Sequence, residues 1–116
     1  AKGSVPPVAV PAAERLAFLR RSNSGHEIDL AQLVIGNVRV LHMPGELFVE
    51  YQLAAKQMWP KLNVAMAAYG DYGTFYIGTE RAYSKGGYET EPRSSNVAPE
   101  VESVLMQGIR KLLSGN

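Results

Sequence analysis

The pattern of apolar and polar residues predicts a β-α-β unit in the middle of the chain. Residues 38–43, V-R-V-L-H-M, favour a strand that ends at the Pro-Gly pair following them. Over residues 46–58 the apolar residues recur at helical spacing, so this segment is expected to be an amphipathic helix. Residues 63–69, N-V-A-M-A-A-Y, are apolar on both faces, which is typical of an interior strand of a parallel or mixed sheet.

One helix is expected before this unit in the sequence and another after it. Residues 11–21 begin with Pro and end with two arginines, which suit the first and last turns of a helix. Residues 99–113 begin with Pro and Glu, carry apolar residues at i,i+3 and i,i+4 spacing, and end with basic residues. The chain is therefore expected to be α/β, with a small mixed or parallel sheet and a C-terminal helix.

The length of 116 residues is that of one domain. Residues 1–10 contain two adjacent prolines and no periodicity, so we expect a flexible lead or linker there and a single α/β domain over residues 11–116. The chain begins A-K-G-S without an initiator Met, and we expect it to be a piece of a longer protein.

Charge and composition exclude several classes of function. The formal charge of +1, with acids and bases interspersed, lacks the one-sign field typical of proteins that bind nucleic acid. The absence of cysteine excludes disulfides, thiolate zinc sites and cysteine nucleophiles. Apolar runs all fall short of the roughly 18 residues needed for a membrane span. We expect neither a nucleic-acid partner nor a membrane span.

A polar residue or polar segment follows each of the two predicted strands. If residues 38–43 and 63–69 are parallel strands, Glu46 and the Tyr/Gly-rich run after the second strand lie at the same edge of the sheet, where ligands normally bind. Glu46 is either an exposed acid favoured by the helix dipole, or a metal ligand or acid/base group. His42 is expected to be a hydrogen-bonded core or supporting histidine, and Asp71 a turn cap.

Five of the chain's six tyrosines fall in or near this run. They either pack beneath a loop, donate a hydrogen bond to a developing oxyanion, or ligate a metal as phenolate. Composition alone leaves these alternatives open. The five are Tyr69, Tyr72, Tyr76, Tyr83 and Tyr88.

Two stretches resemble a known enzyme family. They are L-H-M-P-G-E-L-F-V-E-Y at residues 41–51 and V-A-M-A-A-Y-G-D-Y-G-T-F-Y-I-G-T-E-R-A-Y-S-K-G-G-Y-E at residues 64–89. Over residues 26–113 the chain resembles the later part of the catalytic domain in the neutral/alkaline, non-lysosomal ceramidase family, particularly its bacterial ceramidase-like relatives. That family uses zinc to hydrolyse the amide of ceramide to sphingosine and a fatty acid.

The resemblance assigns roles to three residues. Glu46, in the P-G-E motif, and Tyr76, in the Y-I-G-T motif, are implied to be zinc ligands. Tyr88, in the later Y-E pair, is implied to stabilise the oxyanion. The family takes two further zinc ligands from histidines in an earlier part of the catalytic domain, and neither His26 nor His42 occupies those motifs.

The resemblance therefore implies the C-terminal portion of a zinc-dependent amidohydrolase. The implied partners are the rest of the parent catalytic domain and an N-acyl lipid substrate, and a secreted or periplasmic location is implied. With only two oxygen ligands, the isolated chain is expected to bind zinc weakly and to be inactive. Surfaces that face the missing part could support self-association.

The alternative hypothesis is a non-enzymatic α/β ligand-binding or interaction module, in which Glu46, Tyr76 and Tyr88 only pack. Convergence of these three side chains on one point would favour the hydrolase, because packing alone does not require a carboxylate and two phenols to meet.

Overall fold

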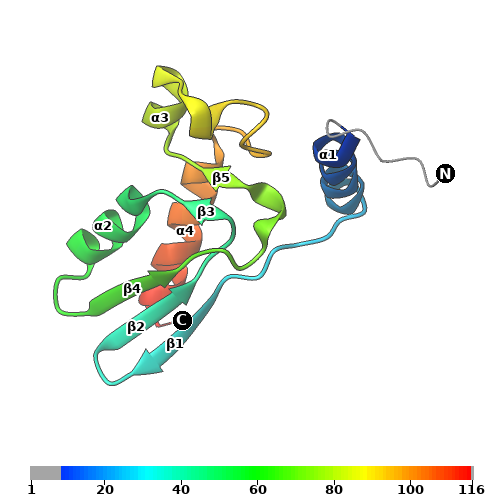
Figure 1. Cartoon of the computed structure of the whole chain (residues 1–116). Coiled ribbons are helices and arrows are strands. Elements are labelled where there is room, and N and C mark those ends of the chain that lie inside the picture. The colour runs from blue at the N-terminus through cyan, green and yellow to red at the C-terminus, as the bar shows by residue number, and fades with distance from the viewer. Residues whose placement is uncertain (1–8, 116) are drawn as a thin grey trace.

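The computed structural model describes residues 9–115 and is an α/β fold (Figure 1). Its helices are α1 (Ala9–Asn23), α2 (Val49–Met58), α3 (Glu80–Lys85) and α4 (Val101–Leu113), with the short 3-10 helices η1 (Tyr72–Thr74) and η2 (Tyr88–Thr90). Its strands are β1 (Ala31–Ile35), β2 (Val38–His42), β3 (Glu46–Leu47), β4 (Asn63–Ala67) and β5 (Tyr76–Ile77).

The predicted β-α-β unit is confirmed. β2 and β4 run parallel, with Val38 opposite Asn63, and α2 forms the connection between them. β1 adds an antiparallel strand to the other side of β2, which gives a three-stranded mixed sheet in the order β1-β2-β4. The two-residue turn between β1 and β2 has Gly36 at its first position with a φ of +58°, the conformation that a type II′ hairpin turn requires.

The core lies on one face of this sheet. β2 contributes Leu41, β4 contributes Val64, and α2 and α4 cover both of them. α4 crosses behind the sheet in Figure 1, and its inward positions recur at helical spacing. Burial of these side chains removes apolar surface from water and supplies the main stabilising term. The buried hydrophobic residues are Leu41, Met43, Tyr51, Ala55, Val64, Ile77, Leu105, Ile109 and Leu113.

The opposite face of the sheet is open among the described residues. The register places Leu33 beside Val40, and Val40 beside Ala65, so these three side chains share that face. Leu33 and Ala65 are exposed, and Val40 is only partly buried. Residues 9–115 therefore form a two-layer structure, with helices on one side of the sheet and a largely apolar surface, which no described residue covers, on the other.

The predicted start of the central helix is wrong. α2 begins at Val49, not at residue 46, because Phe48 is extended (φ −63°, ψ 145°) and Glu46 and Leu47 form β3. Leu47 fits the apolar stripe of the helix, but it is held instead by a ladder with the distant strand β5. A helical period cannot reveal such a partner.

The strand predicted over residues 63–69 is also not an interior strand. β4 ends at Ala67 and lies at an edge of the sheet. Its alanines at 65 and 67 are exposed, because a small apolar side chain fits a solvent-facing position as well as a buried one.

Both terminal helices form as expected, although their starts differ from the prediction and α1 ends at Asn23, two residues later than predicted. α4 begins at Val101, two residues after the predicted Pro99. α1 begins at Ala9, inside the segment expected to be a flexible lead, while residues 1–8 of that lead lie outside the described part of the chain. Within residues 9–115, no helix combines the length and the apolar character needed to cross a membrane.

Candidate functional site

Glu46 and Tyr76 face each other across the short parallel ladder of β3 and β5. They are directly opposed in the register, and the Tyr76 phenol donates a hydrogen bond to the Glu46 carboxylate. This hydrogen bond, together with desolvation and the nearby negative charge, raises the pKa of Tyr76 above its ordinary value. The structure thus brings together two of the three residues singled out by the family resemblance.

Backbone hydrogen bonds hold this ladder in place. The Glu46 N–H donates to the Phe75 carbonyl at 2.8 Å, and the Phe48 N–H donates to the Ile77 carbonyl at 3.1 Å. On the other side of β5, the Tyr76 N–H donates to the Ser94 carbonyl at 3.0 Å. The Glu46–Tyr76 pair is therefore positioned by main-chain contacts from three separate segments.

The turn before β3 depends on Gly45. Its φ is +59°, and a Cβ added there would collide with the Thr74 hydroxyl and the Phe75 carbonyl. Its N–H donates to the Asp71 carbonyl at 3.0 Å, while its own carbonyl accepts from the Tyr69 N–H at 2.7 Å. Glycine lets the β2–β3 turn pass directly against the loop that leads into β5.

That loop is bracketed by two strained residues. Tyr69 has a φ of +66° and Phe75 a φ of +56°, values that residues with a side chain adopt infrequently. Such conformations cost about 1–3 kcal/mol each and persist where surrounding contacts enforce them, most often at functional sites. Here they bend the chain out of β4 and back into β5, directly before Tyr76.

Tyr88, from η2, completes the cluster. Its ring centroid lies 6.0 Å from that of Tyr76 at an interplanar angle of 74°, an edge-to-face contact. The side chain is otherwise exposed, and the Arg93 guanidinium lies 5.4 Å from its ring centroid. The Arg93 Nε also donates to Glu91 at 2.6 Å. Sequence reasoning did not single out Arg93, because nothing in its polar loop distinguishes it from other surface cations.

His42, expected to be a core or supporting histidine, does not lie in the core. His42 is exposed at the carboxyl end of β2, and its ring lies against Gly70, where an added Cβ would come within 2.6 Å of the His42 Cε1. The core alternative is wrong because an apolar strand pattern does not say that its last residue is covered. His26 is exposed as well.

Asp71 caps a turn as predicted, through the Gly73 N–H at 3.1 Å. It also accepts a hydrogen bond from the Arg21 guanidinium at 2.7 Å, and His26 Nε2 lies 3.8 Å from its other oxygen. The Arg21 hydrogen bond is the main reason that the pKa of Asp71 is lowered. Through this contact α1, which stands beside the body in Figure 1, is tied to the loop before β5.

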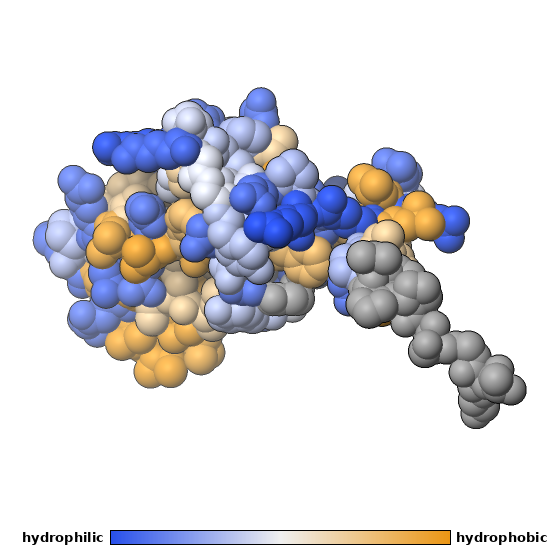
Figure 2. All heavy atoms as spheres, turned by 45° about the horizontal axis from the view of Figure 1, so that its top comes forward, coloured by the Kyte–Doolittle hydropathy of each residue, from blue (hydrophilic) through white to orange (hydrophobic). Residues whose placement is uncertain are grey.

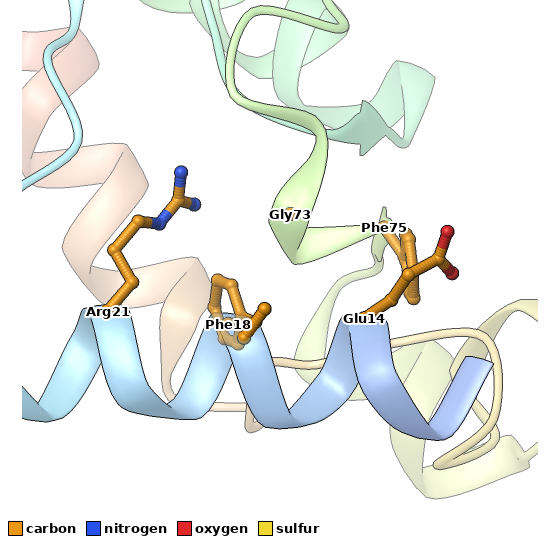
Figure 3. Close-up of a pocket in the computed structure, with 6 residues that line it drawn as sticks. Glu14, Phe18, Arg21, Gly73 and Phe75 are labelled. Carbon is orange, nitrogen blue, oxygen red and sulfur yellow. The ribbon is translucent and has the colours of Figure 1, made fainter. Parts of the chain in front are cut away.

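A cavity of about 320 Å³ lies between α1 and this loop. Figure 3 shows Phe18 of α1 facing Gly73, with Phe75 and Glu14 close together on one side and Arg21 on the other. The lining is largely apolar and includes none of Glu46, Tyr76 and Tyr88. The cavity is therefore distinct from the polar cluster. The two are adjacent in sequence, because Phe75 lines the cavity and directly precedes Tyr76.

The donor atoms of the cluster are suited to part of a zinc site. A carboxylate and a phenol are both oxygen donors, but catalytic zinc usually has three protein ligands and a water. Within residues 9–115, no group of three or more His, Cys, Asp or Glu side chains could hold a metal ion. Glu46 and Tyr76 can thus contribute to a metal centre, but the donors gathered here do not complete one.

Comparison with known proteins found no matching family model, no matching curated protein and no matching solved structure.

Proposed function

We propose that this chain is the C-terminal portion of a zinc-dependent amidohydrolase of the ceramidase type. The observation that supports this best is the meeting of Glu46, Tyr76 and Tyr88, which come from three elements and are linked by a hydrogen bond and a ring contact. These are the residues to which the family resemblance gives catalytic roles. A non-enzymatic module has no need to bring a carboxylate and two phenols together.

In the proposed enzyme, Glu46 and Tyr76 hold the metal together with ligands from outside these 116 residues. Bound zinc would polarise the amide carbonyl and lower the pKa of an attacking water. Tyr88 lies beside Tyr76 with an exposed phenol, so it can donate a hydrogen bond to the oxygen on which charge develops. The substrate class is a linear N-acyl amide, which yields an amine and a fatty acid.

The first test uses the 116-residue chain alone. Calorimetric titration with Zn²⁺ is expected to show no tight 1:1 site, because two oxygen donors fall short of the usual ligand set. An N-acyl sphingoid amide is expected to remain intact, as measured by release of fatty acid. A tight site or measurable hydrolysis would contradict the proposal that the zinc site is incomplete.

The second test uses the longer polypeptide that the proposal implies. Glu46→Gln and Tyr76→Phe are expected to lose bound zinc and activity together, while Glu50→Gln, on the exposed first turn of α2, serves as the matched control. Tyr88→Phe is expected to keep the zinc but to lower kcat by about 10²–10³-fold, the usual effect of removing an oxyanion donor. Zinc content and hydrolysis that are unchanged in all of these variants would favour the non-enzymatic module.

A further inference from the structure

The two edges of the three-stranded sheet differ in how they are protected. At the β4 edge, the Met66 N–H donates to the Gln52 side-chain oxygen of α2 at 2.9 Å. α2 therefore covers that edge and occupies one of its outward backbone groups. β1 forms the other edge, and Figure 1 shows it as the outermost strand of the sheet.

Among residues 9–115, nothing gives β1 the usual protections of an edge strand. Natural edges carry charges, proline or bulges, or are covered by another element. The β1 sequence A-Q-L-V-I is uncharged and pairs regularly with β2 along its whole length. Leu33, Val34 and Ile35 are 57%, 51% and 61% exposed, although they alternate between the two faces. Figure 2 shows apolar residues gathered at the lower end of the body, where Figure 1 places the β1–β2 hairpin.

The hairpin register identifies the free backbone groups. Ile35 and Val38 flank the two-residue turn, so they form the hydrogen-bonded pair that closes it. Because hydrogen-bonded and non-hydrogen-bonded pairs alternate, Leu33 also bonds to β2, whereas Gln32 and Val34 direct their N–H and C=O groups outward. These outward groups lie symmetrically on either side of Leu33.

From this geometry we propose that β1 pairs with the β1 strand of a second copy of the chain. In an antiparallel arrangement centred on Leu33, Gln32 lies opposite Val34 of the partner copy, and both outward pairs exchange N–H···O=C bonds. The contact is isologous, so the same surface serves both copies. The result is a continuous six-stranded sheet, and this assignment is independent of the proposed catalytic function.

A second copy suits this edge for two reasons. The strand has an odd number of residues with its free groups placed symmetrically about the centre, so pairing with itself leaves none of them unmatched. Pairing also places the two Leu33 side chains next to each other on the open face, where they bury apolar surface against a strand that carries no charge. Two five-residue strands bury less than the roughly 800 Å² per partner of a stable interface, so the dimer is expected to dissociate on dilution.

The first experiment traps the pair covalently. The chain has no cysteine, so Leu33→Cys introduces the only thiol. The two positions form a non-hydrogen-bonded pair with a Cα separation of about 4.5 Å, which a disulfide can span. Under mild oxidation, Leu33→Cys is expected to form covalent dimers at least about tenfold faster than Leu53→Cys, an equally exposed leucine on α2. Equal rates for the two variants would overturn the proposal.

The second experiment measures association without cross-linking. Sedimentation velocity of the natural chain from micromolar to millimolar concentration is expected to show a monomer–dimer equilibrium. Val34→Lys places a cation on the pairing edge and is expected to weaken dimerisation roughly tenfold. Val104→Lys, on the exposed side of α4, is expected to have no effect. A chain that stays monomeric throughout, or a dimer that Val34→Lys leaves unchanged, would refute β1 pairing.

Discussion

Replacing Gly45 by alanine is expected to destabilise the fold by opening the turn that sets β3 against β5. A left-handed φ costs a residue with a side chain about 1–2 kcal/mol. The new Cβ also meets the Thr74 hydroxyl and the Phe75 carbonyl, and crowding of this kind costs a further 1–3 kcal/mol or so. The expected loss in the free energy of unfolding is therefore about 2–5 kcal/mol, a large part of the roughly 5–15 kcal/mol of a typical domain.

Gly36 provides a matched control for this substitution. Its φ of +58° is nearly that of Gly45 at +59°, but a Cβ there meets nothing within 4 Å. Gly36→Ala should therefore show only the cost of the backbone conformation, without the crowding found at Gly45. Urea unfolding followed by the fluorescence of Trp59, the only tryptophan, would measure both losses. Equal losses for the two variants would show that the close approach at Gly45 does not carry the energy assigned to it.

Two further predictions concern the contacts around the core and α1. Tyr51→Phe removes the buried hydrogen bond to the Gly78 carbonyl, 2.8 Å long, and leaves that carbonyl without its donor, so urea unfolding should show a loss of about 1–3 kcal/mol. An unchanged midpoint would indicate that water replaces the phenol. The pKa of Asp71 is lowered in the folded chain, so its contact with Arg21 stabilises the docking of α1 above the ordinary pKa of 3.8 and loses this effect as the pH falls through the lowered value. Because the Arg21 side chain is 38% exposed, the effect is expected to be below about 1 kcal/mol. The protection factors of the α1 amides, corrected for the intrinsic pH dependence of exchange, should fall over that pH range, and Asp71→Asn should remove this change; protection factors that stay constant in the unsubstituted chain would contradict the prediction.

Much of the fold follows from local sequence pattern. The β2-α2-β4 unit and α4 were predictable because their apolar periods extend over several turns or a whole strand. β3 was not, because a two-residue strand has no period and exists only through its ladder with β5. The edge position of β4 was also missed, because the apolar character of Ala65 and Ala67 does not determine whether they are buried.

The candidate site was predictable only in part. Spacing placed Glu46 and the tyrosine run at one edge of the sheet but could not choose Tyr76 over its neighbours, and that choice came from the family resemblance. The contacts of Arg21 with Asp71 and of Arg93 with Tyr88 could not be read from the sequence. Both depend on loop geometry that residue type does not determine.

The β3–β5 ladder has a consequence for how this chain could be altered. The backbones of the two opposed residues are held at the strand spacing of about 4.8 Å by main-chain hydrogen bonds and by Ile77, which is fully buried beside them. Because these contacts are made by the main chain, the side chain at either position can be replaced while the hydrogen bonds between β3 and β5 remain. Tyr76→His, for example, would place a carboxylate and an imidazole at directly opposed positions of the two strands, so the ladder sets which donor groups lie side by side.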